Sequence, residues 1–192
     1  NDVKNEYLNP SELIDSDNKK IIEIAKTLIV ENDDLKTAKN ISNYVSRKIK
    51  FDNSTKINQE PLKASEVLEI KKGVCADYSN LMTALLRAAG IPARNIGGLV
   101  LNRLGNSSDW SSPAGSHAWV EFYIDGNWYF DDPTWGNRYF MNSDGYHLSY
   151  GTSIDIHSQE YKDTLDEIKS EGFHIIGAMT SPIRFTAWSD DE

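Results

Sequence analysis

The sequence contains very little cysteine and no long apolar run. Of its 192 residues only Cys75 is a cysteine, which excludes an internal disulfide framework and a cysteine-rich zinc site. The chain contains no stretch of about 18 apolar residues that could cross a membrane. It also does not begin with a basic segment followed by an apolar one, as a signal peptide does. The single thiol is therefore either a small core residue or a nucleophile.

Positive charge is also scarce. The chain has 20 Lys and Arg against 29 Asp and Glu, a formal net charge of −9 at pH 7. Such a balance repels nucleic-acid backbones and anionic membrane surfaces, so we expect no nucleic-acid partner. The first residue is Asn1 rather than Met, which suggests a trimmed or processed chain. We expect an extracellular or cell-surface location, with a cytoplasmic one as the alternative.

The rest of the composition is typical of a folded globular protein. Hydrophobic residues make up 39% and aromatic residues 10% of the chain, enough to form a core. The length falls within the range of one domain. We therefore predict a single domain over residues 1–192, with a helical part at 1–63, a catalytic core at about 64–135 and a C-terminal extension at 136–192.

Apolar spacing predicts helices first and strands afterwards. The predicted helices span about 19–30, 34–49, 64–70 and 75–89, with a weaker one at 158–171. The predicted strands span 93–101, 118–124 and 127–132, with weaker ones at 173–179 and 183–188. A segment rich in Ser, Gly and Asn, 102–116, is expected to be an exposed loop. Helices followed by sheet indicate an α+β fold.

Cys75 lies at the predicted start of a long helix, after Gly73 and Val74. Unpaired N–H groups and the positive end of the helix dipole favour a thiolate there. The same N–H groups could bind a developing oxyanion. The alternative is that Cys75 is an ordinary buried residue, and this segment alone does not decide between the two.

His117 precedes a predicted strand, and two adjacent carboxylates end the next one. If Asp125-Gly126 forms a two-residue turn, the register brings Asp132 to the sheet face of His117, about 7–8 Å away on the diagonal. A three-residue turn would bring Asp131 there instead. A histidine can act as acid and base while a carboxylate orients it. Singly, each residue could also be an ordinary strand-end or turn residue.

Three segments together resemble the transglutaminase-like superfamily: Gly73 to Tyr78, His117 to Glu121, and Asp132-Pro133-Thr134, with similarity also at Leu85 to Arg94. The resemblance implies a papain-like core, in which the nucleophile lies at the N-terminus of a central helix packed on an antiparallel sheet that carries the histidine and the aspartate. It implies that Cys75 is the nucleophile, His117 the acid and base, and Asp132 the orienting carboxylate.

The residues beside these three are expected to have structural roles. Asp77 should stabilise the helix N-terminus, Trp119 should pack or line the cleft, and Glu121 should be a solvated strand residue. The other histidines have no spacing typical of metal ligands: His147, His157 and His174. We therefore expect no metal and no cofactor.

The resemblance implies acyl transfer through a Cys75 thioester. With water as acceptor the protein is a peptidase or amidase, which is our leading hypothesis. With an amine as acceptor it is a protein-glutamine transglutaminase that crosslinks proteins. A binding or scaffold module on the same fold is the third possibility, and the complete set of three residues argues against it. The expected partner is a peptide or protein substrate, with cell-wall peptide among the candidates.

Overall fold

A computed structural model describes residues 3–52, 62–101, 114–143, 147–153 and 184–185. The helices are α1 (Val3–Glu6), α2 (Lys19–Leu28), α3 (Asp34–Lys48), α4 (Ala64–Ile70), α5 (Cys75–Ala88) and the 3-10 helix η1 (Asn137–Tyr139). The strands are β1 (Lys50–Phe51), β2 (Lys72–Gly73), β3 (Ala93–Leu101), β4 (Ala114–Ile124), β5 (Asn127–Asp131), β6 (His147–Ser153) and β7 (Arg184–Phe185). Within these ranges no helix has the length and apolar character needed to span a bilayer.

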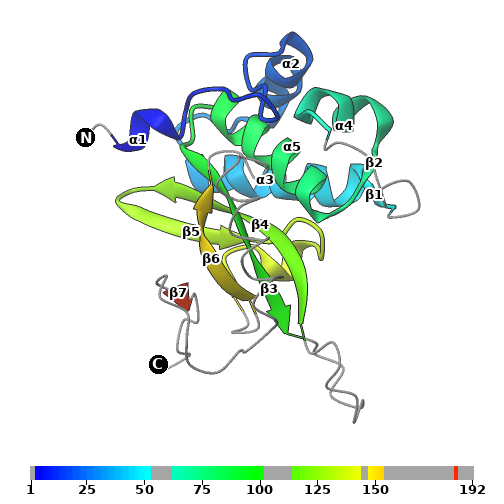
Figure 1. Cartoon of the computed structure of the whole chain (residues 1–192). Helices are drawn as coiled ribbons and strands as arrows, with labels where there is room; N and C mark the ends of the chain where they lie inside the picture. Colours follow the sequence, from blue (N-terminus) through cyan, green and yellow to red (C-terminus); the bar gives the residue numbers. More distant parts are fainter. Residues whose placement is uncertain (1–2, 53–61, 102–113, 144–146, 154–183, 186–192) are drawn as a thin grey trace.

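The elements form two layers, with α2 to α5 gathered on one side of the larger sheet (Figure 1). This sheet has five strands in the order β5-β4-β3-β6-β7, and its neighbouring strands are antiparallel. A separate parallel pair, β1 and β2, lies next to the start of α5. The predicted order of helices followed by antiparallel sheet is confirmed.

The core lies between α5 and the inner face of β4. Apolar residues of α5 are fully buried together with inward-facing residues of β4: Leu81, Met82, Leu85, Leu86, Val120 and Phe122. Burial of each such side chain contributes about 1.5–3 kcal/mol. This packing fixes the long helix across the sheet, so its first residue has a defined position relative to β4.

Capping side chains explain where the helices begin. The carboxamide of Asn18 and the carboxylate of Asp33 accept backbone N–H groups at the starts of α2 and α3. Asp77 accepts the N–H of Val74 at 2.8 Å. These bonds satisfy donors that have no partner within a helix. The predicted role of Asp77 at the start of α5 is confirmed.

The β4–β5 turn decides which carboxylate faces His117. Asp125-Gly126 has positive φ at both residues, 48° and 94°, as a type I′ turn requires. Ile124 pairs with Asn127 across it. The two-residue turn and its register are therefore confirmed, and neighbouring Asp131 and Asp132 point to opposite sides of the hairpin.

Four strands differ from the prediction. The two-residue strands β1 and β2 lie where no strand was predicted. β4 begins at Ala114, inside the segment 102–116 that was predicted to be a loop, because pairing with β3 extends to Leu101. β6 was not predicted. Its alternate residues His147 and Ser149 are buried and polar, so the strand lacks the apolar alternation from which strands are recognised.

The remaining predictions concern the C-terminal part. The predicted helix at 158–171 and strand at 173–179 lie outside the described residues, as does segment 102–113. Of the predicted strand at 183–188, the structure describes Arg184–Phe185, which pairs with β6.

Asp131 is a carboxylate buried on the helix side of the hairpin, with 0% of its surface exposed. Burial raises the pKa of its carboxyl to about 7, while the neighbouring Ser42 hydroxyl opposes the shift and the charge of Asp132 adds to it. The folded protein therefore keeps a proton that the unfolded chain releases near pH 4.

We predict that Asp131→Asn removes a pH dependence of stability. The pKa of Asp131 is raised in the folded state, so this residue contributes to stability fully below about pH 4. Its contribution, roughly a few kcal/mol, is lost as the pH rises through about 7. The amide does not titrate, so the free energy of unfolding of wild type should fall relative to that of the variant between pH 4 and 8. Urea denaturation at both ends of this range measures it, and identical pH dependence of the two proteins would contradict the prediction.

Candidate active site

Cys75 is the first residue of α5 and is half-buried. The segment before it is tightly folded, because a Cβ on Gly73 would lie 2.5 Å from the side chain of Asp77. Glycine therefore lets the Asp77 carboxylate fold back over the chain and hold the helix start. This places the thiol at the end of the helix that favours a thiolate.

His117 and Asp132 meet where β4 and β5 lie side by side. Nε2 of His117 lies 2.7 Å from Oδ2 of Asp132, while Oδ1 of Asp132 accepts the backbone N–H of Thr134 at 3.0 Å. His117 also lies close enough to Cys75 for the thiol to raise the pKa of the imidazole. Because Nε2 is held by Asp132, Nδ1 is the nitrogen available to the thiol. The structure thus brings together the three residues that the sequence selected.

Charge stabilises this arrangement. Burial alone would lower the pKa of His117, but the hydrogen bond to Asp132, the neighbouring Cys75 and the negative charge of both groups raise it to about 10. Burial alone would raise the pKa of Asp132, but hydrogen bonds and charge from His117 and His147 lower it to about 2. The favoured state is an imidazolium beside a carboxylate, which can also stabilise a thiolate.

His147 is a fourth polar member of this cluster that the sequence analysis missed. It comes from β6, is 1% exposed, and has Nε2 3.2 Å from Oδ2 of Asp132. His147 was considered from the sequence only as a metal ligand, for which it has no typical spacing, and its contact with Asp132 was not predicted. The sequence carried no signal for this contact. The strand of His147 could not be recognised from its residues, and it pairs with β3 rather than with the hairpin that holds Asp132.

Gly98 allows the backbone of β6, the strand of His147, and the ring of Trp119 to approach β3 closely. It lies on β3, between β4 and β6, where a Cβ would be 2.2 Å from the carbonyl oxygen of Leu148 and 2.4 Å from the ring of Trp119. A β-bulge in the β3–β6 pairing lies between Gly97 and Gly98, and such irregularities re-aim side chains. The sheet is thus shaped locally to bring β6 up to the site.

Aromatic rings surround the polar cluster. Trp135 stacks on His117, with centroids 4.6 Å apart and planes at 15°, and it is 41% exposed, so it forms an outer wall. Trp119 is fully buried, which confirms the expected packing role. Its ring, with those of Phe130 and Tyr139, lies 5.0–5.6 Å from the imidazole of His147. An apolar shell strengthens the electrostatic interactions inside it.

Glu121 differs from the expected solvated residue. It is 9% exposed and accepts two hydrogen bonds from Arg94, at 2.9 and 2.5 Å. The two residues are directly opposite on β4 and β3, and the ring of Trp128 covers the guanidinium at 3.9 Å. Glu121 is therefore part of a structural ion pair, which the alternation of one strand could not reveal.

Three side chains could in principle hold a metal ion. Among the described residues, His117, Asp132 and His147 form such a group, with ligand atoms within 4.8 Å of one another. Their Nε2–Oδ2 separations of 2.7 and 3.2 Å are hydrogen-bond lengths, whereas neighbouring ligands in a tetrahedral zinc site with bonds of about 2.1 Å are roughly 3.4 Å apart. The geometry therefore favours a hydrogen-bonded network.

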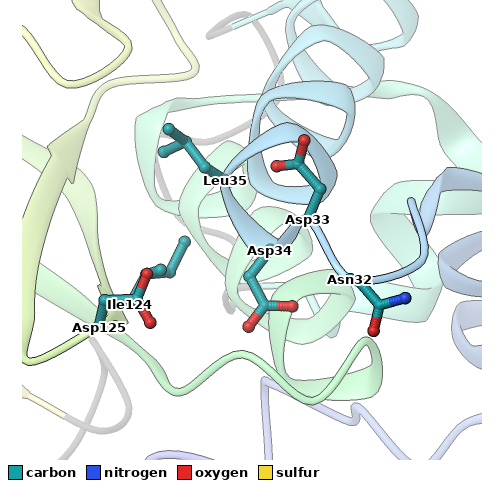
Figure 2. Close-up of a pocket in the computed structure, with 6 residues that line it drawn as sticks. All are labelled: Asn32, Asp33, Asp34, Leu35, Ile124 and Asp125. Atoms are coloured by element: carbon teal, nitrogen blue, oxygen red, sulfur yellow. The ribbon is translucent and has the colours of Figure 1, made fainter.

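A separate pocket lies between the start of α3 and the β4–β5 turn (Figure 2). It is lined by Asn32, Asp33, Asp34, Leu35, Ile124 and Asp125. One of these side chains, Asp33, already caps α3. Neither Cys75 nor His117 lines this pocket, so it is distinct from the candidate active site.

The geometry agrees with a family assignment. The model of the transglutaminase-like superfamily matches residues 23–133, more than half of the 192 residues. The chain belongs to this superfamily. The resemblance seen in the sequence is thereby confirmed.

Known relatives include both peptidases and transferases. Kyphoscoliosis peptidase of Mus musculus and of Homo sapiens is 25% identical over 118 residues, 60% of this chain and 18% of that protein. A protein-glutamine gamma-glutamyltransferase of Pseudomonas aeruginosa is 35% identical over 72 residues, 36% of this chain and 11% of that protein. The chain thus spans less than a fifth of the length of either relative.

A solved structure supports the fold. The crystal structure of a candidate cysteine protease from Cytophaga hutchinsonii matches with a TM-score of 0.65 and 25% identity, covering 83% of this chain and 50% of that chain. The predicted α+β, papain-like and transglutaminase-like fold class is confirmed.

The positions of Cys75 and His117 predict an unusually reactive thiol. A thiol at a helix N-terminus beside an imidazolium should react with iodoacetamide well below pH 8, whereas an ordinary thiol ionises near pH 8.5. Iodoacetamide labelling from pH 5 to 10, with the adduct located by mass spectrometry, measures this. In His117→Ala the rise in rate should move to the range of an ordinary thiol. A wild-type profile that coincides with that of the variant would contradict the prediction.

Proposed function

We propose that the protein is a cysteine-dependent acyltransferase that acts on peptide or protein amides, with water as the main acceptor. The observation that supports this best is the buried contact of 2.7 Å between Nε2 of His117 and Oδ2 of Asp132, beside a cysteine at a helix start. A base oriented by a carboxylate next to a nucleophile is the arrangement that acyl transfer requires.

In the first half of the proposed reaction, the Cys75 thiolate attacks the amide carbon and the carbonyl oxygen becomes an oxyanion. Backbone N–H groups at the start of α5 stabilise this oxyanion. The His117 imidazolium donates its proton from Nδ1 to the leaving nitrogen. The C–N bond breaks, an amine leaves, and a thioester and a neutral imidazole remain.

In the second half, neutral His117 takes a proton from water as the water oxygen attacks the thioester carbon. The C–S bond then breaks, the carboxylic acid product leaves, and the thiolate–imidazolium pair is restored. Asp132 stays ionised throughout: it fixes the orientation of the imidazole and stabilises its positive charge. If an amine attacks in place of water, the product is a new amide.

Relatives support both acceptors. The peptidase name of the mammalian relatives and the protease description of the Cytophaga hutchinsonii structure favour water. The name of the Pseudomonas aeruginosa relative, a protein-glutamine gamma-glutamyltransferase, favours an amine and makes crosslinking the second candidate. A silent scaffold is disfavoured, because burying a charged His–Asp pair costs free energy and buried groups with strongly shifted pKa values cluster at functional sites.

The acceptor is tested with a peptide library that includes glutamine-containing peptides, incubated with and without a primary amine. Mass analysis separates cleavage, deamidation and amine adducts. We expect cleavage or deamidation without the amine, and only a minor adduct with it. An adduct as the dominant product would replace hydrolysis by crosslinking as the main activity.

Cys75→Ala should abolish every one of these products while the fold is kept, because the thiol forms the intermediate but lies at a helix start outside the apolar stripe of α5. Circular dichroism and the melting temperature control for folding. A folded Cys75→Ala protein with wild-type turnover would exclude the thioester mechanism.

The two adjacent carboxylates provide a matched pair of variants. Asp132→Asn should lower kcat/KM strongly, by up to about 10⁴-fold as the same change does in a serine protease triad, because an amide cannot stabilise the imidazolium. Asp131→Asn, on the opposite face of the hairpin, should change kcat/KM far less. Both are assayed on the same substrate after equal folding has been shown. A larger loss in Asp131→Asn would reverse the assignment of the orienting carboxylate.

A further inference from the structure

Oδ2 of Asp132 has two histidine neighbours. Nε2 of His117 lies 2.7 Å away and Nε2 of His147 lies 3.2 Å away. An ionised carboxylate can only accept hydrogen bonds, so both nitrogens must carry a hydrogen and donate it to the same oxygen. For His147 this selects a protonated Nε2.

His147 is held in one orientation. It projects from β6, which pairs with β3 on the side opposite to β4. Its ring meets the edges or faces of the surrounding aromatic rings: Trp119, Phe130, Trp135 and Tyr139. A ring packed on several sides cannot turn away without losing these contacts, so the bond to Asp132 is built into the fold.

Three donors together fix the Asp132 carboxylate: the N–H of Thr134 on Oδ1, and the two imidazoles on Oδ2. Without His147 the carboxylate would be held on Oδ2 by His117 alone, the very residue that it has to orient. Because His147 also donates to Oδ2, the orientation of the Asp132 carboxylate does not depend on His117 alone. Second partners of this kind are what keep orienting groups in place.

We propose that His147 is a positioning residue of the active site, an Nε2–H donor from β6 that holds Asp132 in the orientation in which it supports His117. This inference rests on the proposed function for the roles of His117 and Asp132. His147 acts through Asp132 and does not touch the substrate. The unit that prepares Cys75 is thus a chain of four side chains.

Two variants separate hydrogen bonding from packing. His147→Phe keeps a ring in the aromatic enclosure but removes the donor, and His147→Gln keeps an N–H donor without the ring. The rate of iodoacetamide labelling of Cys75 at pH 6 needs no substrate. We expect about a tenfold loss of rate in His147→Phe, a shift of the pH profile toward that of an ordinary thiol, and recovery of most of the rate in His147→Gln.

The outcomes are distinguishable from those of the proposed function. If wild type itself shows no labelling below pH 8, the thiol mechanism fails. If wild type is labelled at low pH and a folded His147→Phe is labelled equally fast, the positioning role is overturned while the mechanism stands. If His147→Phe is faster than His147→Gln, packing rather than donation matters, and the proposal is again overturned.

The wild-type protein gives an independent test, which holds even if a variant fails to fold. Long-range ¹H–¹⁵N spectra of histidine-labelled protein should show a hydrogen on Nε2 of His147, and an Nε2 that carries no hydrogen would overturn the proposal. Labelling with and without EDTA adds a further control. A rate that rises on chelation in wild type but not in His147→Phe would show a bound divalent ion in place of the hydrogen bond.

Discussion

The packing of α5 on the sheet determines where the thiol lies relative to the imidazole. Apolar contacts hold the helix against β4, and a buried polar network fixes its position along β3, since Asn95 donates to Asn80 at 2.7 Å and accepts from Thr83. A helix shifted by one turn would leave these buried groups unpaired, at a cost of about 1–3 kcal/mol each. The packing therefore fixes one position of α5 along β3, and in this position the N-terminus of the helix lies beside His117.

Strand geometry gives two neighbouring carboxylates opposite properties. Asp131 and Asp132 differ only in the sheet face toward which they point, yet the pKa of the first is raised to about 7 and that of the second is lowered to about 2. Both are buried, so burial does not distinguish them. The hydrogen-bond donors do: two imidazoles face Asp132, whereas Asp131 faces the hydroxyl of Ser42.

Local patterns predicted what depends on nearby residues. The helix starting at Cys75, the turn at Asp125-Gly126 and the choice of Asp132 all follow from short segments with defined geometry. Glu121 and His147 could not be predicted, because their environments come from partners on β3 and from a strand with polar inward residues. Burial of polar groups is decided by tertiary pairing, which alternation along one strand does not encode.

The position of β6 beside β3 affects how the chain can be divided. The residues matched by the family model end at 133, just after Asp132, and a fragment cut there would retain Cys75 and His117. It would also lose the strand that pairs with the second edge of β3, leaving a row of backbone donors and acceptors open to association with other chains. The smallest fragment that keeps both neighbours of β3 is therefore longer than the region of family similarity, and a shortened protein would be prone to aggregate through β3.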